Sequence, residues 1–330
     1  MRIAVVGGGI FGCVTAVELA RAGERVELFE RRADILLAAS RCNQGRLHRG
    51  YHYPRAWDTA QKCKTESRRF AARYPEAIDR SHDHFYLLAR EQSLTSSAAY
   101  LAFLAEMGLA YDAVDSHFVE PEGVALALEV PEALVDLNRL RELLREELAE
   151  AGVRVHIGAG FYGGGWDAIV DASYGHWLAT TPRRYELCEL ALVELPKPFA
   201  RRSIVVMDGP FVSIDPIPGT PYHQLYDVRH SVHAAHTAHL PDLPPNSRSV
   251  FGAMLRNARL FVKLPEVKYL RSRFTVRAVL PDVDATDERP TLVNVIFPGL
   301  LQIFPGKIDT ALYAADEVLR NLAIRTPALC

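Results

Sequence analysis

The chain has 330 residues, and 49% of them are hydrophobic, which is enough to fill one large core or two smaller ones. Its 38 basic and 40 acidic side chains nearly balance, and no long run carries one sign. This argues against a nucleic-acid or anionic-membrane partner and favours a small-molecule substrate. The 5 cysteines form no C-x-x-C pair, so we expect no disulfide framework and no zinc site, and a reducing, cytoplasmic setting.

The apolar N-terminal stretch lacks an extended basic leader and is interrupted by three consecutive glycines, so a signal peptide is not expected. No later apolar run approaches the length of a membrane span. We therefore expect a soluble protein.

Residues 2–30 predict a nucleotide-binding β-α-β unit. The apolar strand "RIAVV" leads into a G-x-G-x-x-G turn, a helix follows and ends at Gly23, and "RVELFE" forms the second strand. The turn consists of Gly7, Gly8, Gly9, Ile10, Phe11 and Gly12. Its glycines allow a tight turn, close approach of a pyrophosphate, and close packing of helix on strand. Glu30 ends the second strand, where it is placed to accept hydrogen bonds from ribose hydroxyls and would repel the 2′-phosphate of NADP.

A dense polar stretch, "SRCNQGRLHRGYHYPR", occupies residues 40–55. Polar groups are costly to bury without partners, so such a stretch is either an exposed loop or a binding site.

Nucleotide-domain character returns twice later in the chain. A helix is predicted over 136–152, followed by the strand "VRVHI", a glycine-rich hinge at 163–165 and "WDAIVDASYG" at 166–175. Residues 291–322 predict two strands, a Pro-Gly-Lys turn and a helix that begins near Ile308 or Asp309. Between these parts, strands at 187–215 and 273–282 predict an antiparallel sheet, and a helical region is expected near 245–270.

This order of segments resembles the D-amino-acid-oxidase-like family of flavoproteins. The resemblance is carried by "VVGGGIFGCVTAVELARAGERVELFER", "AIVDASYG", "TDERP" at 286–290 and "GKIDTALYAADEV". Ser173 and Tyr174 depart from the family, which often has Thr and Gly there. The resemblance implies FAD, which we expect to be bound non-covalently, and an α/β fold: a discontinuous Rossmann-type FAD-binding domain (1–80, 136–182 and 286–330) with an interleaved substrate domain on a mixed or antiparallel sheet (81–135 and 183–285).

Within the family, residues 40–54 most resemble the L-2-hydroxyglutarate oxidase group, and glycerol-3-phosphate dehydrogenases carry a looser version. The matching positions are Ser40, Asn43, Gly45, His48, Gly50, Tyr53 and Pro54. The resemblance places this loop beside the flavin ring and the C-terminal loop near its pyrimidine end, where a helix start would stabilise negative charge on reduced flavin. Besides the turn residues and Glu30, the cofactor contacts it implies are Arg31, Ser40, Asn43, Gly45, Arg46, Leu47, Ala172, Gly306, Lys307 and Ile308. Lys307 as an ordinary solvated lysine is the alternative.

His48 is the candidate catalytic base, because a neutral imidazole can take the proton of a substrate hydroxyl or amine. The alternative is a histidine that only fixes the loop. On an extended strand His52 would share the face of His48 and join it as a catalytic candidate, with Tyr51 and Tyr53 on the opposite face. Candidate substrate contacts are Tyr53, Arg55, Arg277 and Arg289. For Tyr53 the alternative is packing against the sheet, and for Arg277 and Arg289 it is a structural ion pair.

His230, His233, His236 and His239 recur at every third residue. On a helix this spacing turns each ring about 60° further around the axis, so the four cannot converge on one ion, and we expect no metal. The segment is instead expected to run from strand to loop, with one histidine as a possible substrate contact. His82 and His84 are expected at an edge or turn.

The predicted reaction is hydride transfer from a CH–OH carbon, or second a CH–NH carbon, to flavin N5, with reoxidation by oxygen or another acceptor. One alternative is an NAD(P)H-using flavin monooxygenase, although "GKIDTA" stands where a Gly-Asp-Ala segment would be expected. Another is a non-catalytic FAD-binding protein. Covalent flavin attachment at Cys42 or His48 stays open, with release of the flavin by acid expected. The protein is expected to be a monomer or a homodimer.

Overall fold

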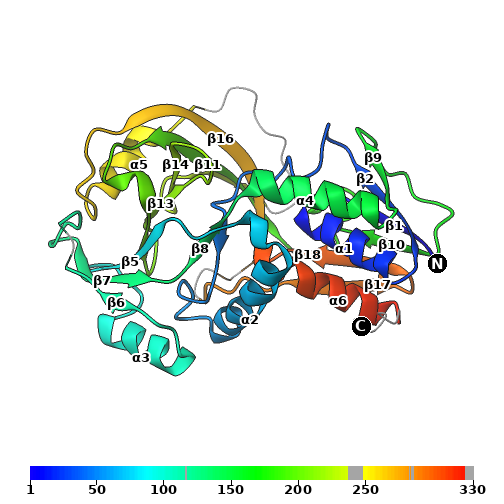
Figure 1. The fold of residues 1–330 in the computed structure, drawn as a ribbon, viewed down its shortest axis with the longest axis horizontal. Coiled ribbons are helices and arrows are strands. Elements are labelled where there is room, and N and C mark those ends of the chain that lie inside the picture. The colour runs from blue at the N-terminus through cyan, green and yellow to red at the C-terminus, as the bar shows by residue number, and fades with distance from the viewer. Residues whose placement is uncertain (116, 237–247, 282, 284–285, 324–330) are drawn as a thin grey trace.

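The computed structural model describes residues 1–115, 117–236, 248–281, 283 and 286–323. Figure 1 shows two lobes, each built on its own sheet.

The first lobe is built on a six-stranded sheet in the order β17-β18-β10-β1-β2-β9. All neighbouring pairs are parallel except β17 with β18 at one edge. The strands are β1 (Arg2–Val6), β2 (Arg25–Glu30), β9 (Arg154–Ile157), β10 (Ala168–Asp171), β17 (Leu292–Phe297) and β18 (Leu300–Phe304). Strands from three distant parts of the chain therefore meet in one sheet, so the first lobe is discontinuous in sequence.

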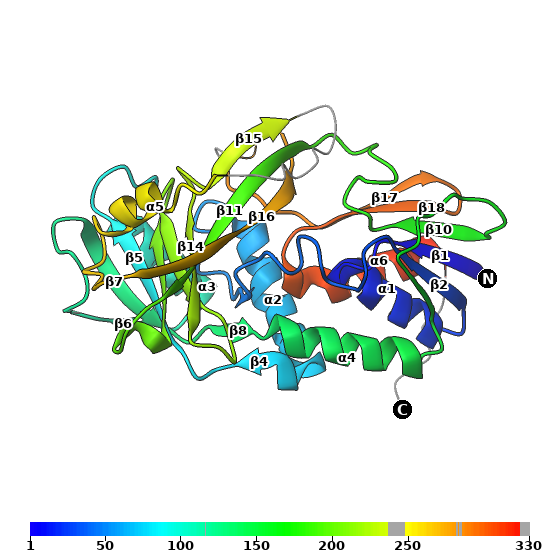
Figure 2. The ribbon, with the colours of Figure 1, turned by 90° about the horizontal axis from the view of Figure 1, so that it is seen from above.

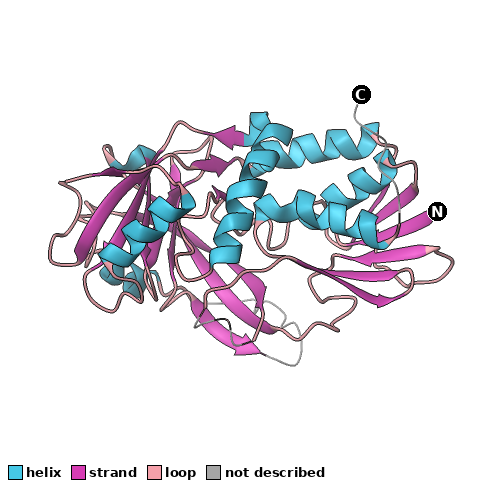
Figure 3. Cartoon of the chain, turned by 90° about the horizontal axis from the view of Figure 1, so that it is seen from below, coloured by secondary structure: helices cyan, strands magenta, loops and turns pink. Residues whose placement is uncertain are grey.

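Three helices cover one face of this sheet: α1 (Ile10–Arg21), α4 (Leu137–Glu150) and α6 (Ala311–Asn321) (Figures 1 and 3). At the start of helix α4, the Asp136 carboxylate accepts hydrogen bonds from the backbone N–H groups of Asn138 and Arg139. Its buried side chains are Leu140, Leu144 and Leu148, a spacing of four that places all three on one stripe against the sheet. Helix α6 begins at Ala311, after a 3₁₀ turn over Ile308–Thr310, slightly later than the sequence predicted.

The second lobe is built on a nine-stranded mixed sheet in the order β15-β11-β14-β13-β12-β5-β7-β6, with β16 also paired to β11. The parallel pair is β5 with β12. The strands are β5 (Asp83–Ala89), β6 (Asp112–Ala113), β7 (Val124–Val130), β11 (Arg184–Glu194), β12 (Arg202–Met207), β13 (Val212–Pro216), β14 (Tyr222–Asp227), β15 (Val232–His236) and β16 (Lys268–Val279). Helices α3 (Ser97–Met107) and α5 (Phe251–Ala258) flank it.

A small sheet and one long helix lie between the lobes (Figure 2). The sheet consists of β3 (Arg46–Leu47), β8 (Ala133–Val135) and β4 (Ile78–Asp79), and the helix is α2 (Trp57–Arg73). Because β3 lies within the polar stretch, this sheet fixes the stretch between the two lobes.

Two local predictions were wrong. Over the described part of the helical region expected near 245–270, the helix α5 ends at Ala258, and the chain from Lys268 onward forms β16 instead. The extended strand expected through His48 and Tyr53 ends at Leu47. Gly50 has a φ of +106° and its carbonyl accepts the Tyr53 N–H at 3.1 Å, so the chain turns there. His48 and Tyr53 were expected on opposite faces of one strand. They are instead neighbours, with their rings 5.7 Å apart.

Candidate cofactor and substrate site

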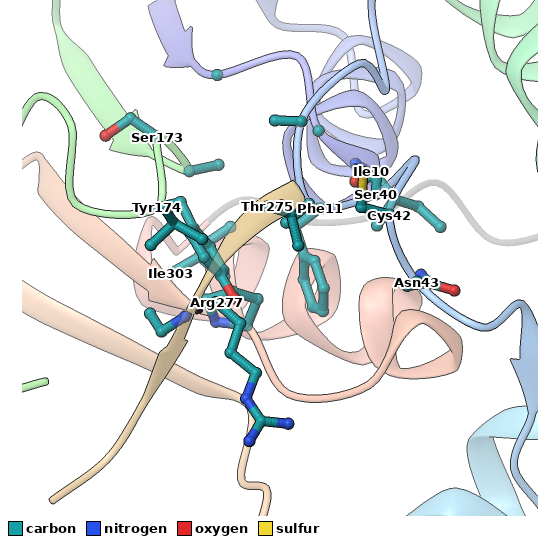
Figure 4. A pocket seen from close by; sticks show the side chains of 18 of the residues that line it. Ile10, Phe11, Ser40, Cys42, Asn43, Ser173, Tyr174, Thr275, Arg277 and Ile303 are labelled. Carbon is teal, nitrogen blue, oxygen red and sulfur yellow. Dashed lines mark hydrogen bonds between the residues drawn. The ribbon is translucent and has the colours of Figure 1, made fainter. Parts of the chain in front are cut away.

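A cavity of about 900 Å³ lies between the two lobes. From the first lobe it is lined by the glycine turn, the ends of β2 and β10, and the loop after β18. From the second lobe it is lined by β16 and parts of β11 and β14. Residues between Leu37 and His48, which include the first half of the polar stretch, also line the cavity. Figure 4 shows Ile10, Phe11, Ser40, Cys42 and Asn43 on one side, with Thr275 and Arg277 reaching in from β16.

The glycine turn is closed toward the sheet and open toward the cavity. A Cβ at Gly7, whose φ is +108°, would lie 2.6 Å from the Ala172 carbonyl oxygen, and one at Gly12 would lie 1.9 Å from the Gly7 oxygen. Gly9 instead borders the cavity, where its nearest neighbour would be the Ser40 hydroxyl at 3.4 Å. The backbone therefore packs tightly on one side and leaves the other side free for a phosphate-bearing group at the start of α1.

Glu30 lines the cavity at the end of β2 and is only 8% exposed. One carboxylate oxygen accepts the Gly8 N–H at 2.7 Å, and the other accepts the Arg32 N–H at 2.7 Å. A carboxylate offers about four lone-pair positions, so acceptor capacity is left for ribose hydroxyls.

Aromatic side chains, which the sequence analysis missed, line the cavity beyond Glu30. The Phe161 ring lies 5.0 Å from that of Phe29 and 5.1 Å from that of Trp177, centroid to centroid. Phe29 directly precedes Glu30, and Phe161 directly precedes the exposed Tyr162 and the glycine-rich hinge. In the sequence, the position of Phe29 beside Glu30 and of Phe161 beside the hinge was the signal from which these rings could have been expected. Flat apolar rings at this end of the cavity fit a purine base.

The polar stretch contributes side chains that are already organised by hydrogen bonds. The side-chain oxygen Oδ1 of Asn43 accepts the Gly45 N–H at 2.6 Å, which forms a local turn. Arg46 is 4% exposed and donates from Nε to Asp215 at 2.7 Å, from Nη2 to the Ser203 hydroxyl at 3.0 Å and from Nη1 to the Tyr86 hydroxyl at 3.3 Å. Arg46 is thus engaged on all three nitrogens, although it borders the cavity.

His48 lines the cavity and is 8% exposed. Its Nδ1 atom is buried and has no hydrogen-bond partner among the described residues. Burial, followed by the nearby cations of Lys307 and Arg46 and the His52 ring, holds the pKa of His48 well below its usual value. The imidazole is therefore neutral at ordinary pH, in the form that can accept a proton.

The other residues predicted around His48 lie off the cavity. The His52 ring is buried 5.9 Å from that of His48, and burial lowers its pKa to about 3. Tyr53 is buried in the core that includes Tyr51 and Tyr86. Arg55 donates from Nε to Asp208 at 2.7 Å. The Gly50 turn directs all three away from the cavity, whereas a continuous strand would have carried His52 back to it.

The roof of the cavity consists of β16 with β11 and β14. Arg277 on β16 lines it and donates from Nε to Glu186 at 2.7 Å. Cys188, Leu190 and Tyr226 complete this wall. The sequence analysis did not find these three, because they lie within ordinary strand patterns.

The C-terminal loop closes the remaining side. A Cβ at Gly306 would lie 2.6 Å from the Arg289 carbonyl oxygen, so the loop packs tightly against residues 289–291. Lys307 lines the cavity with its Nζ 5.0 Å from the centre of the Tyr53 ring, and is not a solvated surface lysine. Burial, then the neighbouring Arg289 charge, lowers its pKa to about 8. Arg289 also lines the cavity and pairs with Asp287 at 2.6 Å.

The predicted cofactor contacts divide into two sets. Those that line the cavity are Gly7, Gly9, Ile10, Phe11, Glu30, Arg31, Ser40, Asn43, Arg46, Ala172, Gly306, Lys307 and Ile308. Gly12, Gly45 and Leu47 pack behind it. The cavity thus joins a phosphate-accepting turn, an acceptor for ribose, an aromatic end and a polar floor, and this arrangement fits FAD.

The described side chains of the histidine-rich segment contact two different carboxylates. His230 contacts Asp227 at 2.9 Å and His233 contacts Glu189 at 2.8 Å. His239 and the side chain of His236 lie outside the described residues. Within the described ranges, no three His, Cys, Asp or Glu side chains are placed to hold a metal ion. The described helices include none with the length and apolar character needed to cross a membrane.

The family model for FAD dependent oxidoreductases (DAO) matches residues 2–315. The FAD-dependent monooxygenase FPY4 of Fusarium mangiferae is 28% identical over 341 residues, covering 96% of this chain and 90% of that protein. The FAD-dependent monooxygenase kojA of Aspergillus flavus is 25% identical, covering 97% and 85%.

Two solved structures show the same fold at low identity. Glycine oxidase from Geobacillus kaustophilus has a TM-score of 0.76 at 17% identity, covering 100% of this chain and 96% of that one. L-alpha-glycerophosphate oxidase from Mycoplasma pneumoniae, with FAD bound, has a TM-score of 0.76 at 14% identity, covering 98% and 95%. The predicted α/β fold class is confirmed.

Proposed function

Because the chain belongs to the family of FAD-dependent oxidoreductases, we propose that it oxidises a CH–OH carbon, or second a CH–NH carbon, of a small polar substrate. The predicted family, the FAD cofactor and the class of enzyme are confirmed by the family match over residues 2–315. The finer resemblance of residues 40–54 to the L-2-hydroxyglutarate oxidase group stays a prediction.

FAD, when bound, accepts a hydride at N5 and passes the electrons to oxygen or another acceptor. The glycine turn and the start of α1 would hold its pyrophosphate, Glu30 its ribose, and Phe161 with Trp177 its adenine. The polar stretch and the loop at Gly306 would hold the flavin ring. The substrate then lies under the β16 roof, near His48.

One observation carries the proposed reaction: a buried, neutral His48 borders the cavity with an unsatisfied Nδ1 among the described residues. As the hydride leaves the substrate carbon, the hydroxyl proton must leave the oxygen for a carbonyl to form. A neutral imidazole at this position can accept that proton.

The test is anaerobic reduction of the flavin by a panel of alcohols, sugar derivatives, hydroxy acids and amines. His48→Asn should retain FAD and lower the rate of flavin reduction by about 10²–10⁴-fold with an alcohol substrate. An unchanged rate would assign His48 to the loop and refute its role as a base.

A second candidate function is monooxygenation, because the curated relatives that cover nearly the whole chain are named FAD-dependent monooxygenases. It requires consumption of NAD(P)H and incorporation of one atom of ¹⁸O₂ into the product. A holoprotein that oxidises NAD(P)H without any alcohol, and is not reduced anaerobically by alcohols, would favour this candidate. Reduction by neither donor would favour a non-catalytic FAD-binding protein.

We also propose that the flavin is held without a covalent bond. Cys42 lines the cavity, but burial raises the pKa of its thiol and so reduces the thiolate needed for attachment. Acid precipitation should therefore release all of the flavin into the supernatant. A cytoplasmic monomer or homodimer, proposed from the sequence, is testable by light scattering and fractionation.

A further inference from the structure

The arginines that line the substrate end of the cavity share one property: each is paired with a carboxylate. Arg46 pairs with Asp215 at 2.7 Å beneath the cavity, Arg277 with Glu186 at 2.7 Å in its roof, and Arg289 with Asp287 at 2.6 Å beside the C-terminal loop. The charges of the arginines at this end are thus largely offset by neighbouring carboxylates.

The pair in the roof is built into the strand register. Arg277 on β16 lies directly opposite Glu186 on β11, so both side chains project from the same face of the sheet. The Glu186 side chain is 6% exposed, and its second oxygen accepts Arg184 Nη2 at 2.8 Å. Arg184 does not line the cavity, so the cation that a ligand there would meet is Arg277 beside Glu186.

This pairing determines which ligands gain binding energy. A ligand carboxylate would lose its hydration on entering and then lie near the Glu186 carboxylate, which already offsets the Arg277 charge. A neutral hydroxyl or carbonyl has far less hydration to lose, and can accept a hydrogen bond from the remaining N–H groups of Arg277.

The rest of the wall is also uncharged. Leu190, Phe274 and Val276 give it apolar surface, and Tyr226 and Cys188 give it neutral polar groups. Among the described residues at this end, Lys307 is a cation without an ion pair, and it lies in the loop assigned to the flavin, near Arg289 and Asp309.

We propose that Glu186 is a specificity-determining residue that makes Arg277 a hydrogen-bond donor of low net charge, and that the substrate is an uncharged hydroxylated compound. The inference rests on the proposed oxidation at this same site. It separates the chain from structural neighbours whose names specify glycine or L-amino acids, with which it shares the fold.

The test uses ligand pairs of equal shape and different charge: lactamide with lactate, and benzamide with benzoate. Binding is followed by the change in flavin absorption of the FAD-loaded protein, without turnover. In the native protein the amide should bind roughly ten-fold more tightly than the matching carboxylate. In Glu186→Gln the preference should reverse, because the Arg277 charge is no longer offset.

Two further variants identify the cause. Glu186→Gln combined with Arg277→Gln should lose the gained carboxylate affinity. Arg184→Gln, which removes a cation from the same carboxylate outside the cavity, should not create that affinity. Flavin content and melting temperature verify the fold of each variant, and the preference of the native protein remains a test if Glu186→Gln does not fold.

Tighter binding of carboxylates by the native protein would overturn the proposal. So would an unchanged preference in a folded Glu186→Gln, or the absence of any carboxylate binding to it. Because these measurements use oxidised flavin at rest, they are independent of the His48 test: failure of flavin reduction would reject the oxidation and leave the charge preference measurable.

Discussion

The two sides of the cavity are built by different means. The proposed cofactor side uses backbone: Gly7 and Gly12 pack so closely that a Cβ would meet main-chain atoms, and α1 starts at Ile10, between them. The substrate side uses long charged side chains whose effect depends on partners from other strands, as with Arg277 and Glu186. A backbone site tolerates almost no change of residue, whereas a site of paired side chains can be retuned by a single substitution.

The variant Gly12→Ala is the strongest test of whether the backbone site tolerates a side chain. A Cβ there would lie 1.9 Å from the Gly7 oxygen, a contact that neither backbone segment can relieve, so we expect loss of FAD binding or of the folded protein. Flavin absorbance per mole of purified protein measures it. Gly252→Ala in α5 is the matched control, since the nearest atom is the flexible end of Arg256 at 3.6 Å, and it should retain full flavin content.

Removing one partner of the buried pair below the cavity should have the next largest effect. The Arg46 and Asp215 side chains are 3% and 0% exposed, so Arg46→Met leaves an uncompensated buried carboxylate and should lower the free energy of unfolding by about 3–5 kcal/mol. Urea unfolding measures it. Arg46→Met with Asp215→Leu should recover a large part of the loss, and no recovery would show that the charge was not the cause.

A substitution at the aromatic end of the cavity should weaken FAD binding without affecting the contacts of the flavin ring. We expect Trp177→Leu to weaken FAD binding about ten-fold, because one stacking surface is lost. FMN lacks the adenine, so its affinity should hardly change. Equal weakening of both flavins would mean that Trp177 acts through the fold of the cavity.

The smallest expected effect concerns Lys307 and pH. Its pKa is lowered to about 8 from a usual value near 10.5, so between these values the unfolded chain binds the proton that the folded chain has released. The free energy of unfolding of the FAD-free protein should therefore rise with pH across this window. Lys307→Met should raise the free energy of unfolding at pH 7 and flatten the rise. A rise that persists in the variant would point to another group.

The same contrast explains what the sequence could predict. The glycine turn, α1, β2 and Glu30 lie within thirty residues, and each is fixed by its neighbours in the chain, so the pattern predicts all of them. His48, which lines the cavity, could be picked out from the sequence because the motif around it is also local. The Arg277 pair, the Cys188 and Tyr226 wall and the position of Phe161 depend on which strands meet, and local periodicity does not contain that information.

The failed prediction around His52 has the same origin on a smaller scale. Alternation along a strand assumes that the strand continues, but Gly50 ends it with a positive φ. Glycine in a polar segment signals a turn as readily as close approach to a ligand, and only the pairing of β3 with β8 shows where the strand stops.

Strand order in the first sheet also affects how the protein is made. Strand β1 pairs with β10, and β10 pairs with β18, so the ribosome must deliver residues up to about Phe304 before the N-terminal glycine turn has its complete sheet around it. Such long-range parallel pairing is slow to form. At the proposed site FAD would contact residues from both ends of this path, and it would so stabilise the finished sheet over its partly folded precursors. Flavin supply during synthesis should therefore limit the yield of folded protein.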